Sequence, residues 1–317
     1  MLKMKKLLIL ILGIFSGAAI YAQQMPLSEN YFLDKYSLSP SYAGNFNNKF
    51  LFMGYRSDWS GIDGGPKTFR LSYNDRFMKN AGFGAKFIYD KAGIFKQLIF
   101  LGSYSYNVKI AEDNSILFGL SAGFYSNTLN LFDYYNDPKY NLDPSLISAN
   151  VTAKLKFMSD VSVVYAFKGF EAGFLFSNIN FGDAKYSQVP LHYKPMANFQ
   201  VHSSYLYNVS ANWDVTPLLI FRGGKYIKSQ FDIASQVEYM KKVWGSLLYR
   251  DSGIWGIGLG ANISKILKIG YKFNIASAVA PRIYNNHEIS IGVNIFELAK
   301  PRKEFIRPAP QEFPKKL

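Results

Sequence analysis

Residues 98–110, LIFLGSYSYNVKI, decide the class of fold. Every second position from Leu98 to Ile110 carries an apolar side chain or a glycine. The positions between them include small or polar residues: Ser103, Ser105, Asn107 and Lys109. Because a β-strand places successive side chains on opposite faces, this stretch predicts a strand with one apolar face and one wet face. About ten residues of such alternation is typical of a membrane-spanning strand.

The same alternation recurs along the chain in about fourteen segments, an even number, as outer-membrane barrels have. They are residues 49–57, 67–75, 82–90, 97–110, 115–128, 159–167, 169–178, 198–211, 214–224, 230–240, 242–250, 253–263, 266–275 and 287–296. The wet faces predict a polar lumen that carries Lys86, Asp90, Arg250, Lys268 and Lys272. In the first segment both faces are apolar, so its register stays open. We therefore predict an all-β fold, a transmembrane antiparallel up-and-down β-barrel.

The lengths of the connections favour this barrel over a soluble β-sandwich. The even-numbered connections are short, as at residues 112–114, 168–169, 241–242 and 264–265, and the long ones, 129–158 and 179–197, are odd-numbered. Outer-membrane barrels combine short periplasmic turns with longer outer loops, which produces this sorting. A sandwich also has alternating strands, but nothing in its architecture predicts the sorting.

The first 22 residues indicate export. Lys3, Lys5 and Lys6 precede an apolar stretch from Leu7 to Ile20, which is the pattern of a secretory signal peptide cleaved after Ala22. The alternative is a membrane anchor, but the apolar run is shorter than the ~20 residues that a membrane span needs. We expect the protein in the outer membrane of a Gram-negative bacterium.

The two ends of the mature chain differ from the barrel region, residues 47–296. Residues 23–46 have an irregular pattern and are predicted to be a segment that can line the lumen. Residues 297–317 are rich in proline and lysine, a composition that cannot fill a core and predicts a mobile periplasmic tail.

The composition excludes several kinds of site. With no cysteine, the chain has no disulfide, no cysteine-based metal site and no thiol nucleophile. The net charge is +14, but the cations are spread along the chain rather than gathered in one patch, so we expect no nucleic-acid partner. Membrane lipids, lipopolysaccharide or an acidic protein are better partners for an exported basic chain.

Catalytic and metal motifs have simpler explanations. Gly119–Gly123 fits G-x-S-x-G, but it lies inside an alternating strand and no helix follows, as a nucleophile elbow requires. Gly256, Gly258 and Gly260 are also on one strand, where they are expected to permit close packing. His192, His202 and His287 lack metal spacing. Asp133, Asp137 and Asp143 leave weak calcium binding open. We expect no enzyme activity, no cofactor and no metal.

Short blocks of sequence resemble the PorP/SprF family of type IX secretion and gliding-motility outer-membrane proteins from Bacteroidetes-type bacteria. They are Leu38–Gly44, Tyr55–Ile62, Gly65–Thr68, Gly82–Gly84 with Asp90 and Gly93, Gly169 with Gly173 and Asn178, Tyr249–Arg250, Gly270–Tyr271 and His287–Ile289. Their order and spacing make the combination specific, and it spans nearly the whole mature chain.

The resemblance implies a non-enzymatic barrel that helps to secrete a large surface adhesin and to hold it at the cell surface. The partners implied are the C-terminal region of that adhesin and the type IX secretion components. The candidate partner-binding residues are Tyr42, Arg56, Trp59, Pro66, Arg250, His287 and Glu288. In the alternative, Arg56 and Trp59 brace the first outer loop. An alternative function is a transport channel for an apolar or anionic solute.

Overall fold

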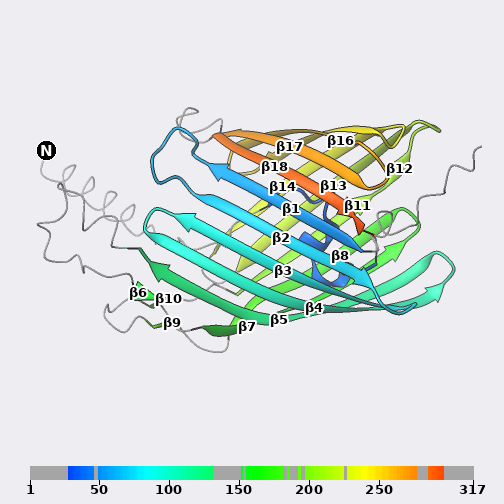
Figure 1. Cartoon of the computed structure of the whole chain (residues 1–317). Helices are drawn as coiled ribbons and strands as arrows, with labels where there is room; N and C mark the ends of the chain where they lie inside the picture. Colours follow the sequence, from blue (N-terminus) through cyan, green and yellow to red (C-terminus); the bar gives the residue numbers. More distant parts are fainter. Residues whose placement is uncertain are drawn as a thin grey trace, which may run out of the picture.

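The computed structural model describes residues 28–45, 49–130, 151–152, 155–180, 184–185, 192–193, 197–224, 227–276 and 285–295. Within them, fourteen antiparallel strands close into a barrel (Figure 1). The strands of the ring are β1 (Phe50–Asp58), β2 (Lys67–Arg76), β3 (Ala81–Ala92), β4 (Phe95–Ala111), β5 (Asn114–Leu129), β7 (Lys156–Phe167), β8 (Phe170–Asn180), β11 (Asn198–Tyr205), β13 (Trp213–Gly224), β14 (Ile227–Tyr239), β15 (Val243–Arg250), β16 (Ile254–Asn262), β17 (Leu267–Ala276) and β18 (Asn285–Asn294).

Each strand of the ring pairs with its neighbours in sequence, and β1 pairs with β18 to close it. Four short strands lie outside the ring: β6 (Val151–Thr152) extends the edge of β5, β12 (Tyr207–Asn208) pairs with β13, and β9 (Ala184–Lys185) pairs with β10 (His192–Tyr193). The predicted up-and-down barrel is confirmed. No helix among the described residues is long and apolar enough to cross a membrane.

The two ends of the barrel differ in the length of their connections. We call the end with residues 77–80, 112–113, 168–169, 206–212, 240–242 and 263–266 the short-turn end, and the other the long-connection end. The long-connection end carries residues 59–66 and the connections from β5 to β7 and from β8 to β11, beside the short turns 93–94 and 251–253. Because short turns face the periplasm in outer-membrane barrels, the long-connection end faces outward.

The outer wall is apolar and the inner wall is largely polar. On β5, Phe118 and Leu120 are exposed on the outside, while Ser121 faces inward and is buried. Strand β1 departs from this rule, because its inward side chains include Phe50 and Phe52, each 1% exposed. They form a cluster with Leu33 from the N-terminal segment, which explains why both faces of this strand are apolar in sequence.

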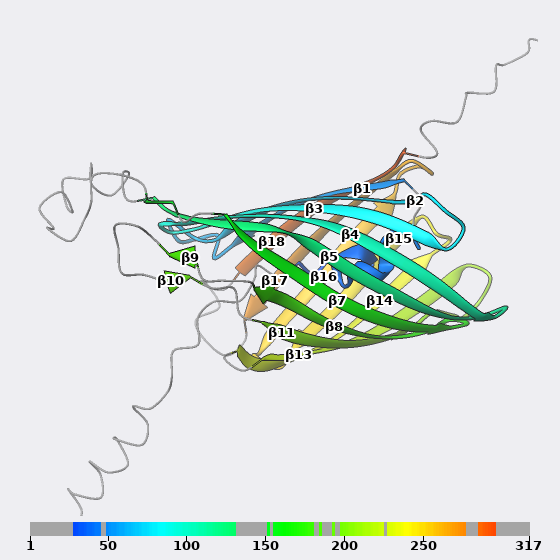
Figure 2. The same ribbon diagram turned by 90° about the horizontal axis from the view of Figure 1, so that it is seen from below.

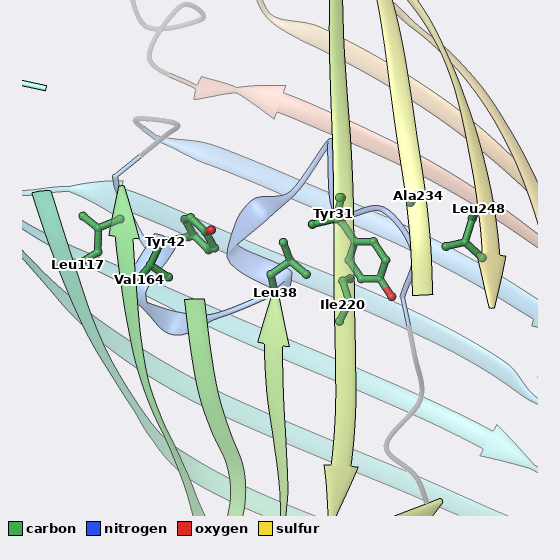
Figure 3. Close-up of a cluster of buried hydrophobic side chains, with 9 residues drawn as sticks. Tyr31, Leu38, Tyr42, Leu117, Val164, Ile220, Ala234 and Leu248 are labelled. Atoms are coloured by element: carbon green, nitrogen blue, oxygen red, sulfur yellow. The ribbon is translucent and has the colours of Figure 1, made fainter. Parts of the chain in front are cut away.

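Residues 28–45 lie inside the barrel, as both views show (Figures 1 and 2). We call this segment the plug; it contains the short 3₁₀ helices η1 (Lys35–Ser37) and η2 (Pro40–Tyr42). Its apolar side chains pack across the lumen against the wall (Figure 3). The cluster comprises Tyr31, Leu38 and Tyr42 from the plug with Leu117, Val164, Leu218, Ile220, Ala234 and Leu248 from the strands. The plug and the inner wall therefore form a hydrophobic core inside the barrel.

The wall has glycine where the plug approaches most closely. A Cβ atom on Gly119 would overlap the backbone at Pro40 and Ser41 in η2, and one on Gly82 would overlap the carbonyl of Ala43. Nearby, the hydroxyl of Ser105 donates to that carbonyl, with Oγ and O 2.5 Å apart. Gly119 opens the G-x-S-x-G pattern, so the structure gives this glycine a packing role.

We expect Gly119→Ala to push η2 away from β5, because the added methyl group has no space there. Cleavage of the detergent-solubilised barrel by trypsin at Lys35 should become at least several-fold faster, as measured by mass spectrometry of the released peptide. Gly102→Ala is the matched control, since the nearest atom to a Cβ there is 3.8 Å away. Equal cleavage rates in the two variants would contradict this packing role.

Candidate functional site

The plug is fixed in the lumen by a buried carboxylate, that of Glu29, which is 1% exposed. Its Oε1 lies 3.3 Å from Nη1 of Arg56 on β1 and 3.1 Å from Nη2 of Arg250 on β15. The Nδ2 of Asn274 on β17 donates to Oε2, and the ammonium of Lys272 donates to the backbone carbonyl of Glu29. A buried charge is tolerated when it is paired and hydrogen-bonded, as Glu29 is.

The network around Glu29 continues into the wall. Ser28 donates its hydroxyl to Glu288 Oε1 at 2.9 Å, and Glu288 Oε2 lies 3.7 Å from Nη1 of Arg56. On the other side, Asp232 accepts two hydrogen bonds from Arg250, with N–O distances of 2.8 and 3.1 Å. Asp232 also pairs with Arg222 at 2.7 Å, and Arg222 donates to the phenol oxygen of Tyr31 at 2.7 Å.

We call Glu29, Arg56, Arg222, Asp232, Arg250, Lys272, Asn274 and Glu288 the Glu29 network. It joins the plug to strands β1, β13, β14, β15, β17 and β18. These strands, with β16 between β15 and β17, form one continuous arc of the ring, so the first residues of the plug are held to one side of the lumen.

Electrostatics keep Glu29 ionised. Burial by itself raises the pKa of its carboxyl, but the positive charges of Arg56, Arg250 and Lys272 outweigh burial. The pKa is therefore lowered from its ordinary value of 4.5 to about 2. The carboxylate is therefore charged at any pH that the cell meets.

A second attachment holds the other end of the plug. The phenol of Tyr42 donates to Glu171 Oε2 on β8 at 3.0 Å, and its oxygen lies 2.9 Å from Nε2 of His202 on β11. Lys35 pairs with the same carboxylate, with Nζ and Oε1 2.7 Å apart. Burial and the neighbouring carboxylate of Glu171 both raise the pKa of Tyr42, so the phenol stays protonated and donates.

Hydroxyl groups make a third set of contacts at mid-plug. Tyr36 and Ser103 on β4 have oxygens 2.6 Å apart, and Ser41 and Ser162 on β7 have theirs at the same separation. Ser103 in turn contacts Ser121, the central residue of the G-x-S-x-G pattern, at 2.7 Å. Ser121 is therefore part of a hydrogen-bond network inside the lumen, and it is 0% exposed.

The candidate partner-binding residues fall in four places. Arg56, Arg250 and Glu288 belong to the Glu29 network, and Tyr42 contacts Glu171 and His202. Trp59 and Pro66 lie in the connection from β1 to β2, where Trp59 is 37% exposed. His287 is on β18, where its ring lies against Phe273 and its Nδ1 is 2.6 Å from the phenol oxygen of Tyr271, which is exposed on the outer wall.

The remaining candidates add no metal centre. No group of His, Asp and Glu that could hold a metal ion occurs within the described parts of the chain. Asp133, Asp137 and Asp143 lie outside the described residues, so calcium binding there is untested. A Cβ on Gly256 would meet the side chain of Asn274, and one on Gly258 would meet that of Ser246, so these glycines permit close packing within the lumen.

Comparison with known proteins identifies the family. The family model described as "Type IX secretion system membrane protein PorP/SprF" matches residues 20–293. The chain belongs to the PorP/SprF family. This is a family of secretion-system membrane proteins and not of enzymes, and it places the barrel in the outer membrane. No curated protein matches the sequence.

Solved outer-membrane barrels resemble this PorP/SprF protein in fold. The CymD monoaromatic hydrocarbon channel matches with a TM-score of 0.51 and 12% sequence identity, over 85% of this chain and 93% of that chain. A Pseudomonas aeruginosa FadL homologue matches with a TM-score of 0.48 and 10% identity, over 81% and 94%. The likeness to CymD shows a shared barrel architecture.

We expect Glu29→Gln to release the plug, because it leaves two buried arginines without their shared carboxylate. Removing one partner of a buried ion pair typically costs about 3–5 kcal/mol. In planar lipid bilayers the variant should pass a larger ionic current than the wild type. Glu238→Gln is the matched control, since Glu238 accepts from Asn262 near the short-turn end. An unchanged current in Glu29→Gln would show that Glu29 is dispensable for closure.

The low pKa of Glu29 predicts a defined pH range for its contribution to stability. A carboxyl whose pKa in the folded protein lies below its ordinary value of 4.5 contributes its full stabilisation of the folded state above pH 4.5. This contribution is lost as the pH falls through about 2. The difference in unfolding temperature between the wild type and Glu29→Gln should therefore be constant from pH 8 to pH 5 and shrink towards pH 2. A difference that disappears near pH 6 would mean that the cations do not lower this pKa.

Proposed function

We propose that this PorP/SprF barrel is a secretion accessory and cell-surface anchor for a large adhesin exported by the type IX secretion system, linked to gliding motility. The observation that carries the proposal is the plugged lumen. Residues 28–45 are tied to the wall by buried ion pairs at one end and by the Tyr42 contacts at the other. A barrel filled in this way has no open channel for a protein partner to cross, so it meets such a partner at its long-connection end.

The connection from β1 to β2, residues 59–66, is the surface that best suits such a contact. Trp59 and Ile62 are 37% and 43% exposed at the long-connection end. The connection is held in place, because Ser60 donates its backbone N–H to Asn285 Oδ1 at 3.0 Å and its hydroxyl to the same atom at 2.7 Å. Trp59 has a φ of 54°, an uncommon backbone conformation for a bulky residue. A preformed apolar surface lowers the entropy cost of binding a partner.

Arg56 supports this connection from inside the barrel. Its Nε pairs with Asp58 Oδ1 at 2.8 Å, at the outer end of β1. Because the guanidinium also contacts Glu29, we propose that Arg56 couples the plug to the outer connection and does not itself bind the adhesin.

The ends of the chain complete the proposal. We propose that residues 1–22 are a cleaved signal peptide and that residues 297–317 form a periplasmic tail that contacts other type IX components. Strand β18 supports the position of the tail, because it ends at Asn294 at the short-turn end. Membrane lipids and lipopolysaccharide surround the apolar outer wall in this account.

A transport channel is the alternative function. The CymD structure carries the name of a hydrocarbon channel, but at 12% identity the likeness extends to the fold alone. Passage of a solute through this barrel requires displacement of the plug, since the plug packs against both sides of the lumen (Figure 3).

We expect Trp59→Ala with Ile62→Ala to abolish recovery of the adhesin with the tagged barrel from outer membranes in mild detergent, and to abolish its surface display. Barrel abundance should stay constant, because both side chains are exposed. Leu247→Ala with Leu259→Ala is the matched control on the lipid-facing wall, where each leucine is 63% exposed.

Two outcomes would contradict the anchor. If barrel abundance falls in proportion to display, the two residues are structural. If the wild-type barrel purifies without a large secreted protein and conducts solutes, the channel is the better explanation.

A further inference from the structure

A cavity of about 170 Å³ lies beside the plug. It is bounded by η1, by the start of η2 and by side chains from both sides of the lumen; the polar ones include Asp34, Arg70, Lys86, Asp160, Asn178 and Gln200. Arg70 lies in the outer half of β2, and Asn178 lies near the outer end of β8. We call it the outer cavity, because it occupies the half of the lumen nearer the long-connection end.

Lys86 presents a cation to the outer cavity. Its ammonium lies 4.1 Å from the centre of the Tyr36 ring, and this contact fixes its position. Among the described residues, it forms no hydrogen bond or ion pair. By contrast, the cations of the Glu29 network are all paired with carboxylates or with a backbone carbonyl. Lys86 is therefore suited to receive an anion from outside the chain.

The two carboxyl groups that line the outer cavity already have partners. Asp34 Oδ2 accepts from the hydroxyl of Ser72 at 2.9 Å, and Asp160 Oδ1 accepts from the backbone N–H of Asn178 at 2.9 Å. Burial raises the pKa of Asp34, against the opposite effects of Lys86 and Ser72, which favours its neutral form. Arg70 adds a second cation on the strand next to Lys86. The cavity thus tolerates one entering negative charge.

The rest of the lining is apolar. Leu38 on the plug and Phe52, Ile88, Leu101 and Leu175 on the strands also border the cavity. A ligand that fits this lining has a small apolar body next to its charged group, because contact between that body and the apolar side chains removes apolar surface from water, which favours binding.

We propose that the outer cavity binds a carboxylate carried on a short apolar body, with the carboxylate at Lys86 and Arg70. Two sources have this chemistry: a free small carboxylic acid, and a carboxyl group of an exported partner that enters from the long-connection end. The second source rests on the proposed function, whereas the binding site itself does not.

Titration calorimetry of the purified full-length barrel tests the site, with benzoate, benzyl alcohol and benzylamine as probes that share a phenyl ring, are similar in size and differ in charge. We expect the wild type to bind benzoate and to bind neither other probe measurably. Lys86→Met should weaken benzoate binding at least tenfold, and Lys86→Arg should restore part of it. Lys109→Met is the matched control, since Lys109 is exposed at the end of β4.

Three results would overturn the proposal: no benzoate binding by the wild type, equal binding by Lys86→Met, or equal binding of benzylamine. The Lys86→Met barrel is accepted for the test only if trypsin cleaves its plug no faster than that of the wild type. If it fails this check, Lys86→Gln and Lys86→Arg replace it, and equal benzoate binding by these two variants overturns the proposal.

Recovery of the adhesin from cells then separates the two sources. If the carboxylate belongs to the partner, Lys86→Met lowers recovery of the adhesin with the barrel, and added benzoate does the same to the wild type. If recovery is unchanged while benzoate binding is lost, the ligand is a free acid. Failure of the Trp59 and Ile62 test with intact benzoate binding would refute the anchor and leave the cavity site standing.

Discussion

The ion pairs of Glu29 with Arg56 and Arg250 are the interaction on which the plugged lumen depends. A fourteen-stranded ring directs half of its side chains inward, and in this chain several of them are charged. Those charges need either water or fixed partners. The plug supplies the partners on one side of the lumen, and so a polar lumen and a filled lumen are compatible.

The wall has adapted to the plug in both shape and chemistry. Gly82 and Gly119 leave space for the backbone of residues 40–43, and Phe50 and Phe52 replace the polar residues expected on an inner face. Serine hydroxyls on β4 and β7 meet those of the plug. These features come from strands far apart in sequence, which indicates that plug and wall form a single folded unit.

Much of the fold could be predicted from the sequence, because alternation with period two indicates strands and the sorting of connection lengths favours a barrel over a sandwich. The alternation along residues 98–110 and the short turns at 112–113 and 168–169 are local signals, and the family resemblance added to them. The lumen positions of Arg250 and Lys272 also followed from the alternation. The register of β1 did not, since Phe50 and Phe52 make sense only once Leu33 is known to lie against them.

The candidate site was less accessible from the sequence. Glu29 stands in an irregular segment with no periodicity, so nothing local indicates that its side chain meets Arg56 and Arg250, both of which are distant in the chain. Arg56 was expected near the outer loop because of the Trp59 motif beside it, but its side chain points into the lumen and ends on Glu29. No sequence motif marks Asp232 or Arg222 as part of the site. Long-range pairing of this kind is decided by tertiary structure.

The most direct test of the plugged barrel uses the absence of native cysteine. Ser41 in η2 and Ser162 on β7 have hydroxyl oxygens 2.6 Å apart, although 121 positions separate them in sequence. A Ser41→Cys, Ser162→Cys double variant should form an intramolecular disulfide in isolated outer membranes, as detected by mass spectrometry of tryptic peptides. Two thiols that stay free and react fully with maleimide under oxidising conditions would contradict the account, because the plug would then not lie in the lumen.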